Sequence, residues 1–353
     1  RMVKSGTQGV EFISVNTDKQ ALAVSSADQK IQIGEKLTHG QGAGSDPDVG
    51  KRSAEESRND IAKSLEDADM VFITAGMGGG TGTGAAPTVA EIAREAGALT
   101  VGVVTKPFKF EGKRRMDQAL GGINSLLGKV DSLLIIPNDR LKYATDQKVT
   151  LANAFEIADD VLRQAVTSIS DLIKNTGFIN LDFADVTTIM KDAGFAHMGV
   201  GHAVGKGKAE EAAKMAVASP LMETSINGAH GVLINVTGSE DMGLEDVEAA
   251  ANLVQEAAHP DANIIFGATF DNSLDDEIRV TVIATGFEEG RAKVPGAEAQ
   301  AKPAAAEGLY TQASQQAAQP QQQAQPQPQA PAQPQAPQED DPYDTIFKIF
   351  NSR

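Results

Sequence analysis

The amino-acid sequence predicts an α/β protein of two units that are joined by a long central helix and followed by a disordered tail. Short apolar runs alternate with amphipathic stretches through residues 1–150, as expected for a mostly parallel sheet covered by helices. An unbroken helical pattern occupies residues 153–174, and a second set of alternating runs follows it. After residue 287 the apolar pattern gives way to Gln, Ala and Pro. We therefore expect two folded domains and an unstructured end.

The first domain, residues 1–150, is predicted from its strand-like runs. Strands are expected at residues 9–16, 70–75, 99–105 and 132–136, and helices at residues 53–65 and 88–95 among others. The central helix, within residues 151–176, has about 22 residues and is therefore roughly 33 Å long. Its apolar residues form more than one stripe, so we expect it to contact several neighbours, as a helix between two domains would.

The second domain, residues 177–287, repeats the α/β pattern. Helices are expected at residues 208–218 and 244–258, and strands at residues 231–237, 262–269 and 277–286. A second glycine-rich stretch, residues 199–207, is interpreted as a turn, with His197 and His202 in the same loop. The five histidines show no metal-ligand spacing, so no metal site is predicted among them.

The tail divides into a linker, residues 288–340, and a terminal peptide, residues 341–353. Between residues 303 and 338, 13 Gln, 10 Ala and 7 Pro account for 30 of 36 residues, a composition that cannot form a core and predicts a flexible tether. Apolar side chains return at Ile346, Phe347, Ile349 and Phe350. They predict either a docking peptide that folds on a partner or a frayed terminus with incidental apolar residues.

Composition narrows the functional classes. The net charge of −17 argues against nucleic acid as the main partner, because an acidic surface repels phosphate backbones. The absence of cysteine excludes disulfides and fits a reducing compartment. No apolar run approaches the ~20 residues of a membrane-spanning helix, and no signal-peptide pattern is visible. We therefore expect a cytoplasmic protein without direct membrane insertion.

Six glycines within nine residues form the clearest functional motif. They occupy positions 76, 78, 79, 80, 82 and 84, between an apolar strand and a helical stretch with Pro87 near its start. A strand, a glycine turn and a helix N-terminus together present backbone amides and the positive end of a helix dipole to a polyphosphate. The run lacks the lysine of a P-loop and the G-x-G-x-x-G spacing, so neither common nucleotide fingerprint applies. The alternative is a flexible turn without a ligand.

The motif Gly78-Gly-Gly-Thr-Gly-Thr-Gly84 resembles the signature of the tubulin and FtsZ superfamily of GTPases. Five further blocks resemble bacterial FtsZ proteins and occur in the same order: Val15-Asn-Thr-Asp18, Gly42-Ala-Gly44 with Pro47, Lys106-Pro-Phe-Lys-Phe-Glu-Gly112, Ile136-Pro-Asn-Asp-Arg140 and Asn180-Leu-Asp-Phe-Ala-Asp185. The resemblance covers roughly residues 3–286. It implies a tubulin-like architecture, in which a Rossmann-like GTPase domain is joined by the central helix to a smaller α/β domain.

One block of that family has no counterpart here. The family begins with a strand and a first glycine-rich phosphate loop that ends in an asparagine. Residue 1 of this chain is Arg. We therefore expect that the sequence lacks its true N-terminus and, with it, part of the nucleotide site.

The resemblance implies which residues of the first domain bind a guanine nucleotide. The phosphate-binding positions would be Gly78, Gly79, Gly80, Thr81, Gly82 and Thr83, together with Ala43, Gly44 and Ser45. Glu111 and Arg115, whose spacing alone indicates an exposed ion pair, would contact the ribose and phosphate region. Asp159 would bind the guanine edge, which carries a donor pair that adenine lacks. Phe155, one helical turn earlier, is either a stacking face for the base or a core aromatic. GTP or GDP with Mg²⁺ is the expected ligand.

Asn180, Asp182 and Asp185 form the second group. Their position before a helical stretch is typical of a helix cap. The resemblance implies a catalytic role, in which this loop enters the nucleotide site of the next subunit and its acids polarise the attacking water near the γ-phosphate. Carboxylates suit this task because they accept hydrogen bonds from water and can hold hydrated Mg²⁺.

The resulting prediction is a GTPase that polymerises head to tail and forms the filament ring at the mid-cell division site of a bacterium. The terminal peptide would bind division proteins and membrane tethers, although it departs from the family's common Leu-Asp-Ile-Pro-x-Phe form. The alternative is a non-catalytic scaffold of the same fold, in which the nucleotide only gates folding. An oxidoreductase is disfavoured, because the glycine spacing is wrong and no hydride-transfer site is visible.

Overall fold

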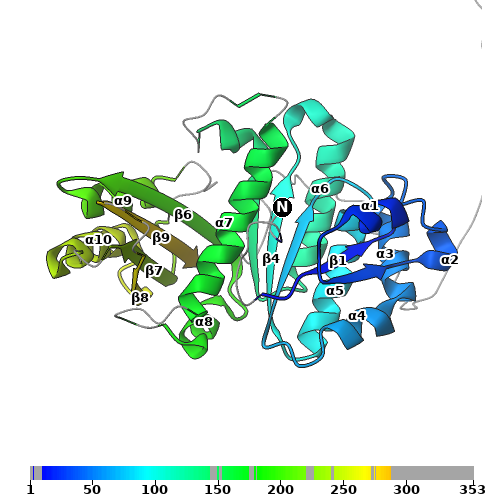
Figure 1. The fold of residues 1–353 in the computed structure, drawn as a ribbon, viewed down its shortest axis with the longest axis horizontal. Coiled ribbons are helices and arrows are strands. Elements are labelled where there is room, and N and C mark those ends of the chain that lie inside the picture. The colour runs from blue at the N-terminus through cyan, green and yellow to red at the C-terminus, as the bar shows by residue number, and fades with distance from the viewer. Residues whose placement is uncertain are drawn as a thin grey trace, which may run out of the picture. The chain divides into compact units, whose positions relative to one another are not determined.

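The structure of the protein, a computed structural model, describes residues 3, 10–143, 149–150, 153–174, 179, 181–219, 226–239, 242–271, 274 and 276–287. Figure 1 shows the fold, whose first half comprises β1 (Ile13–Asn16), α1 (Lys19–Val24), β2 (Gln29–Gln32), α2 (Glu35–Thr38), α3 (Pro47–Glu56), α4 (Arg58–Ser64), β3 (Met70–Gly76), α5 (Thr81–Glu95), β4 (Leu99–Lys106), η2 (Lys109–Glu111), α6 (Lys113–Leu127), β5 (Ser132–Pro137) and η3 (Asn138–Tyr143). The second half comprises α7 (Ala154–Lys174), α8 (Phe183–Met190), β6 (Gly194–Val204), α9 (Lys208–Val217), β7 (Gly231–Gly238), α10 (Leu244–Ala257), β8 (Asn263–Phe270) and β9 (Glu277–Thr285).

The strands form two sheets. β1 and β2 pair in parallel, and the other seven strands form one sheet in the order β3-β4-β5-β6-β9-β7-β8. The first four of these strands are parallel to one another, whereas β9 runs antiparallel to both β6 and β7. Gly76 pairs with Thr105, and Lys106 pairs with Pro137, so β3, β4 and β5 end at the same edge of the sheet. Segments that follow these strands are thereby brought together.

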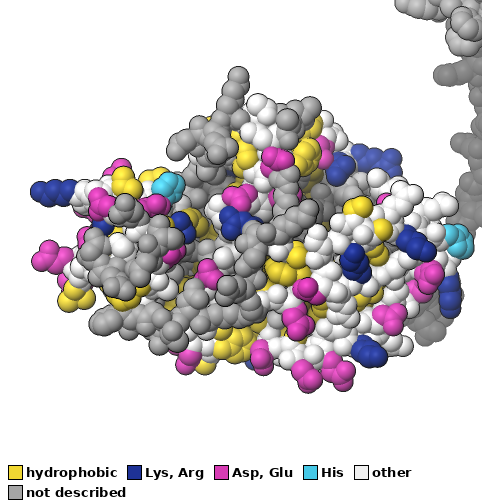
Figure 2. All heavy atoms as spheres, in the orientation of Figure 1, with side chains coloured by type: hydrophobic (Ala, Val, Ile, Leu, Met, Phe, Trp, Pro, Cys, Tyr) yellow, Lys and Arg dark blue, Asp and Glu magenta, His cyan; other side chains and the backbone are white. Residues whose placement is uncertain are grey.

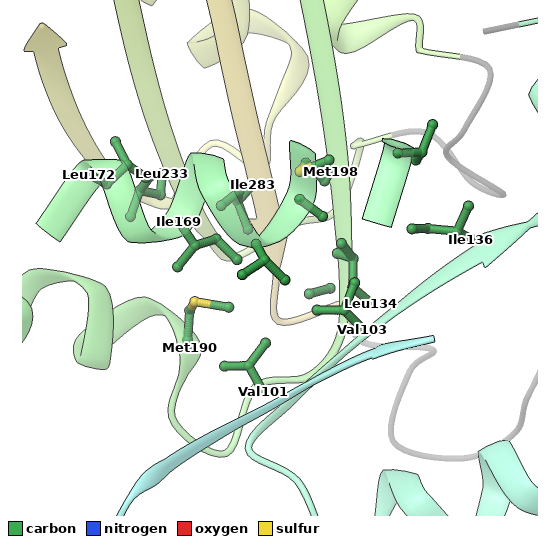
Figure 3. Close-up of a cluster of buried hydrophobic side chains, with 14 of the residues drawn as sticks. Val101, Val103, Leu134, Ile136, Ile169, Leu172, Met190, Met198, Leu233 and Ile283 are labelled. Atoms are coloured by element: carbon green, nitrogen blue, oxygen red, sulfur yellow. The ribbon is translucent and has the colours of Figure 1, made fainter. Parts of the chain in front are cut away.

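Alternating side chains of the strands supply different hydrophobic clusters. On β5, Leu133 packs into a cluster with helices α3 to α6, whereas Leu134 and Ile136 pack with α7 and α8 on the other face. Figure 3 shows this second cluster, in which Ile169 of α7 lies with side chains of both halves of the chain. This burial on several sides confirms the environment expected for the central helix. A third cluster joins α9 and α10 to β7 and β9, through residues that include Val280.

Two glycines of β6 permit close packing of α9. An ideal Cβ on Gly199 would lie 1.9 Å from the carbonyl oxygen of Ala216, and one on Gly201 would lie 1.9 Å from that of Ala212. Side chains at these positions would push the helix away from the sheet. The expectation that residues 199–207 form a turn, with His197 and His202 in a loop, was therefore wrong: both histidines lie in β6, and only residues after Val204 turn. The glycines resemble a turn in the sequence because their packing partner is distant along the chain.

Other elements follow the sequence pattern with shifted bounds. The strands predicted at residues 70–75, 99–105 and 132–136 are present as β3, β4 and β5. The predicted strand at 9–16 begins only at Ile13, and the helix predicted at 53–65 is two helices that are separated at Ser57. The linker and terminal peptide lie outside the described residues. None of the helices in the described part of the chain is long and apolar enough to cross a membrane.

The face of the molecule in Figure 2 carries acidic and basic side chains that are interspersed over the described residues. A few large apolar side chains are exposed as well. Among them are Phe110 and Phe155, which are 65% and 48% exposed and belong to the site described next. Exposed aromatic rings at one place on a surface indicate a binding region.

Candidate nucleotide-binding site

The candidate site lies at the sheet edge where β3, β4 and β5 end. The glycine run connects β3 to α5, the segment from Pro107 to Gly112 connects β4 to α6, and η3 follows β5 directly. In open parallel sheets, ligands bind outside the carboxyl ends of the strands, in the crevice between such connections. The candidate residues of the first domain therefore share one edge, as the register requires.

The glycines of the run have different surroundings. Gly78 has a φ of +100°, and its ideal Cβ would lie 2.7 Å from Cγ of Arg115. At Gly84 a Cβ would lie only 1.9 Å from the carbonyl oxygen of Pro47, because α3 packs closely on α5. A Cβ on Gly79 would meet nothing within 4 Å. The run therefore serves tight packing in part, and it leaves open space beside the backbone at Gly79.

The first turn of α5 consists of Thr81, Gly82 and Thr83. Amides in the first turn of a helix have no intrahelical acceptor, so they are available to an anion. The hydroxyl groups make contacts within the protein: Oγ1 of Thr83 accepts a hydrogen bond from the amide of Gly78 at 2.8 Å, and Oγ1 of Thr81 lies 2.6 Å from that of Thr17. The threonines thus hold the shape of the turn. Thr17 belongs to the block Val15-Asn-Thr-Asp18, but no role in the site was predicted for it.

A loop from the start of the domain covers the glycine run. An ideal Cβ on Gly80 would lie 2.8 Å from Cβ of Ala43, so the two segments are in close contact. Gly44 borders open space, and Ser45 adopts a φ of +59°, which is uncommon for a residue other than glycine. The side-chain amide of Gln118 on α6 donates to the carbonyl oxygen of Ser45 at 3.1 Å. The structure therefore brings the predicted residues 43–45 beside the predicted residues 78–83.

Glu111 and Arg115 form the ion pair that their spacing indicates. Nε of Arg115 lies 3.0 Å from Oε2 of Glu111, whose side chain is only 11% exposed. The other oxygen, Oε1, accepts a hydrogen bond from the amide of Phe108 at 2.8 Å. The pair spans Gly112, whose φ of +99° turns the chain from η2 into α6. The carboxylate is thus fixed by the protein, and its remaining lone pairs can still accept from a ligand hydroxyl.

Aromatic rings surround the start of α7. Phe155 contacts Phe108 edge to face, with ring centroids 5.6 Å apart, and Phe108 stacks on Phe110 at 5.1 Å. Asp159 lies one helical turn after Phe155 and is exposed, as is the Phe155 ring. Phe155 therefore contacts the core at one edge while much of its ring faces solvent. Both alternatives for this residue, core aromatic and stacking face, agree in part with that position.

Asn138 is a candidate that the sequence reasoning missed. It follows the last residue of β5 and is 5% exposed, and its Oδ1 is a buried side-chain oxygen without a hydrogen-bond partner in the structure. A buried unpaired acceptor is costly, and a bound ligand with a donor group would relieve that cost. The signal was present in the sequence, because Asn138 lies directly after an apolar strand at the ligand-binding edge of a parallel sheet.

Asp182 and Asp185 form the N-terminal cap of α8. Oδ1 of Asp182 accepts from the amide of Asp185 at 2.8 Å, and Oδ2 of Asp185 accepts from the amide of Asp182 at 3.1 Å. This reciprocal arrangement is a capping box. The helix-cap interpretation is therefore confirmed for these two residues, and Asn180 lies outside the described residues.

The C-terminal end of α8 and the glycine run lie at opposite ends of the β3-β4-β5 part of the sheet. The last residue of α8, Met190, accepts a hydrogen bond through its carbonyl oxygen from Oγ of Ser132, the first residue of β5. Asn138 and the glycine run lie at the other end of that strand, about 20 Å away for six residues. Figure 1 shows α8 near the lower end of the long helix α7. One copy of the chain therefore does not bring the two groups of predicted residues together.

The residues at the carboxyl edge fit a nucleotide. The open space at Gly79 and the free amides of α5 suit phosphates, the exposed ring of Phe155 suits a base, and the unpaired oxygen of Asn138 suits a donor group. Within the described residues, no group of three or more His, Cys, Asp and Glu side chains is arranged to hold a metal ion. Mg²⁺ is usually held by the phosphates of a substrate and one or two carboxylates.

Comparisons with known proteins show the family to which the chain belongs. Residues 3–146 match the GTPase domain of the tubulin/FtsZ family, and residues 194–288 match the C-terminal domain of the FtsZ family. An empty FtsZ dimer from M. jannaschii is 42% identical, with a TM-score of 0.78, over 85% of this chain and 90% of that one. A mutant FtsZ from M. jannaschii is 45% identical, with a TM-score of 0.77, over 82% of this chain and 86% of that one.

A more distant protein has the same fold. The GTPgS-bound protofilament of CetZ2 from Haloferax volcanii is 19% identical, with a TM-score of 0.69, over 82% of this chain and 87% of that chain. At that identity the likeness concerns the fold alone. The two family matches and the extensive identity to FtsZ carry the assignment. The chain belongs to the tubulin/FtsZ family of GTPases and has the C-terminal domain of its FtsZ members.

Proposed function

We propose that the protein is a GTP-dependent, self-assembling GTPase that forms the filament ring at the bacterial division site. One observation carries the proposal: the candidate nucleotide-binding edge lies at the carboxyl end of β5, whereas α8, which carries the acidic cap, ends beside the first residue of β5. A second copy that stacks head to tail would place its α8 over the glycine run of the first. The FtsZ dimer among the similar structures supports self-association of this kind.

The residues at each end suit their parts of the reaction. The amides at the start of α5 would bind the phosphates, and Glu111 and Arg115 would contact the ribose and phosphate region. Asp159 would accept from the two donors of guanine, with the ring of Phe155 against the base. From the neighbouring copy, Asp182 and Asp185 would orient and polarise the attacking water, and Asn180 would belong to the same loop. Hydrated Mg²⁺, held by the phosphates and these carboxylates, would stabilise the charge on the leaving phosphates.

The substitution Asp185→Asn tests the catalytic role. Loss of a group that polarises water is expected to reduce GTP turnover by at least about 100-fold while GTP binding is retained. The matched control is Asp246→Asn, because Asp246 is the third residue of α10, as Asp185 is of α8, and its Oδ2 likewise accepts from the amide of the N-cap residue, Gly243. Each substitution weakens one helix cap, at a cost of about 1 kcal/mol. Only Asp185→Asn is expected to affect turnover.

Two results would contradict the proposal. Normal turnover in Asp185→Asn would remove the catalytic role of the α8 acids. Tight GTP binding by the unaltered protein without turnover, at concentrations where it sediments as filaments, would favour a nucleotide-gated scaffold.

The terminal peptide, residues 341–353, lies outside the described residues, and its role is part of the same proposal. It would bind division proteins and membrane tethers, so that the filament gathers at the cytoplasmic side of the mid-cell membrane. Replacing Phe347 and Phe350 with alanine is expected to abolish capture of such partners and to leave GTP turnover unchanged. Equal capture by the altered and unaltered proteins would show that the peptide is a frayed end.

A further inference from the structure

Phe108 contacts both Phe155 and Glu111 of the candidate nucleotide site. It belongs to the block from Lys106 to Gly112, but neither that resemblance nor the proposed function gives it a role. Its ring is 7% exposed and lies between two rings that are largely exposed, Phe110 and Phe155. The contact with Phe155 is edge to face, at 5.6 Å and 89°, and that with Phe110 is stacked, at 5.1 Å and 14°. Both are favoured arrangements for aromatic pairs. The buried ring therefore restricts the orientation of the exposed Phe155 ring.

The backbone of the same residue holds the carboxylate of Glu111. The amide of Phe108 donates to Oε1 of Glu111 at 2.8 Å, and the carbonyl oxygen of Phe108 accepts from the amide of Glu111 at 3.0 Å. Oε2 of Glu111 then holds Nε of Arg115 at 3.0 Å. The chain is fixed further at the next residue, because the amide of Lys109 donates to Oδ1 of Asp139 at 3.3 Å. Phe108 thus holds both the ring of Phe155, through its side chain, and the carboxylate of Glu111, through its backbone.

We propose that Phe108 is a positioning residue of the nucleotide site, whose ring orients Phe155 against the base while its amide orients Glu111 toward the ribose and phosphate. This inference rests on the proposed binding of GTP. An exposed aromatic ring without support can adopt several rotamers, and ordering it on binding has an entropic cost. The contact with Phe108 already orders the Phe155 ring before the ligand binds, so less entropy is lost on binding. The consequence is that substitution of Phe108, which need not touch the nucleotide, weakens recognition of the base.

The test separates the base from the rest of the nucleotide. Dissociation constants of the whole protein are measured for GTP and for ribose 5-triphosphate, which lacks a base. The dissociation constant of ribose 5-triphosphate divided by that of GTP reports the contribution of the base, and this quotient is the ratio used below. Phe155→Leu is expected to lower this ratio about tenfold, the effect of losing one stacking contact. Phe108→Leu, which keeps the backbone amide, is expected to lower it by a similar factor. Because the ring of Phe108 acts through that of Phe155, the double substitution should lower the ratio no further than Phe155→Leu does.

Two further variants distinguish positioning from general stability. Phe108→Tyr keeps the ring and is expected to retain the ratio of the unaltered protein. Ile169→Val removes a methyl group from the same hydrophobic cluster, at a position that is 1% exposed, and is expected to lower the thermal midpoint without changing the ratio. Melting curves by circular dichroism establish folding. If Phe108→Leu does not fold, Phe108→Met replaces it, because a flexible thioether fills an aromatic site without presenting a ring edge.

The contact between the Phe108 amide and Glu111 is tested by a separate measurement. Glu111→Gln keeps the shape of the side chain but weakens its charged contact with Arg115. We expect it to weaken binding of ribose 5-triphosphate and GTP by the same factor, so the ratio stays constant. A changed ratio in this variant would show that Glu111 acts on the base and would overturn the division of roles.

The possible failures are distinguishable. If the unaltered protein binds GTP no better than ribose 5-triphosphate, base recognition is absent, and the proposed function fails together with this inference. If the unaltered protein shows a clear ratio that Phe108→Leu leaves unchanged, the inference alone is overturned. An additive loss in the double substitution would also overturn it, because the two rings would then act independently.

Discussion

Gly79 and Gly84 belong to the same run and have different surroundings. A methyl group at Gly79 would enter open space, whereas one at Gly84 would lie 1.9 Å from the carbonyl oxygen of Pro47. We expect Gly84→Ala to destabilise the protein by about 3 kcal/mol, because two helix backbones would have to separate. Gly79→Ala should leave the thermal midpoint within a few degrees and weaken GTP binding at least about tenfold, since its methyl group would occupy the space assigned to phosphate. Thermal melts and calorimetric titration measure the two effects. Unchanged GTP affinity in Gly79→Ala would place the phosphates elsewhere.

Asp159 is the residue proposed to select guanine. It is exposed on α7, one turn from Phe155, so a ligand can reach its carboxylate. Asp159→Asn replaces one acceptor with a donor, and the loss of a matched polar pair costs about 1 to 3 kcal/mol. We expect GTP affinity to fall roughly tenfold or more and the preference for GTP over ATP to relax. Competition binding with both nucleotides measures this. Full discrimination in the variant would direct attention to Asn138, the buried residue with an unpaired oxygen.

At the scale of elements, α5 is tied to its neighbours by ion pairs at the end away from the glycine run. Glu91 pairs with Lys129, which follows α6, and with Arg58 of α4 at 3.8 Å, while Arg58 also reaches Glu95 at 2.5 Å. The hydrogen bond from the Lys129 ammonium lowers the pKa of the Glu91 carboxyl below its ordinary value. These side chains are more than a third exposed, so each pair contributes little.

The Glu91 pairs should make stability depend on pH. A carboxyl whose pKa is lower in the folded than in the unfolded state contributes fully above its unfolded pKa of about 4.3, and the contribution is lost as the pH falls through the folded value. We expect Glu91→Gln to reduce the free energy of unfolding by about 0.5 kcal/mol at pH 7. The difference from the unaltered protein should disappear once the pH falls below the lowered pKa of Glu91, and also in 1 M salt. Urea denaturation at several pH values measures it. A difference that persists in acid would mean that the charge is not responsible.

At the scale of the whole molecule, the separation of the acids from the glycine run predicts complementation between two impaired variants. Asp185→Asn keeps a functional nucleotide edge, and Gly79→Ala keeps functional acids. In a filament of equal parts, about one site in four would combine the intact edge of one with the intact acids of the other. We therefore expect the mixture, at a GTP concentration too low to saturate Gly79→Ala, to recover roughly a quarter of the normal GTP turnover, although each variant alone retains little turnover.

Sedimentation with GTP and with GDP controls that experiment, because both variants must be present in the pelleted filaments. Co-assembly without recovered turnover would contradict a site shared between copies. Turnover by Asp185→Asn alone would place the acids of the reaction elsewhere in the chain.

The sequence by itself determined the local elements and the class of chemistry. The strands β4 and β5 were predictable because each is a largely apolar run that is buried on both faces of the sheet. β3 was predictable as a short apolar run, although only alternate residues of it are buried. The glycine run was predictable because its backbone requirements exclude most other residues. The cap formed by Asp182 and Asp185 was predictable because it is closed by contacts three residues apart. In each case the interacting groups are close in the chain, so the pattern is visible without the fold.

Only the tertiary structure decided which distant groups meet. The sequence pattern predicts a turn at the glycines of β6, which is wrong. Gly199 packs closely against the carbonyl oxygen of Ala216 in α9, and that residue is 17 positions further along the chain. The ring of Phe108 meets that of Phe155 across 47 residues, and the unpaired oxygen of Asn138 depends on burial by several elements. The same holds for the position of α8 at the far edge of the sheet, which follows from its contact with the start of β5. Strand register and helix packing set these distances, and they arise from the fit of whole surfaces, which no local sequence pattern encodes.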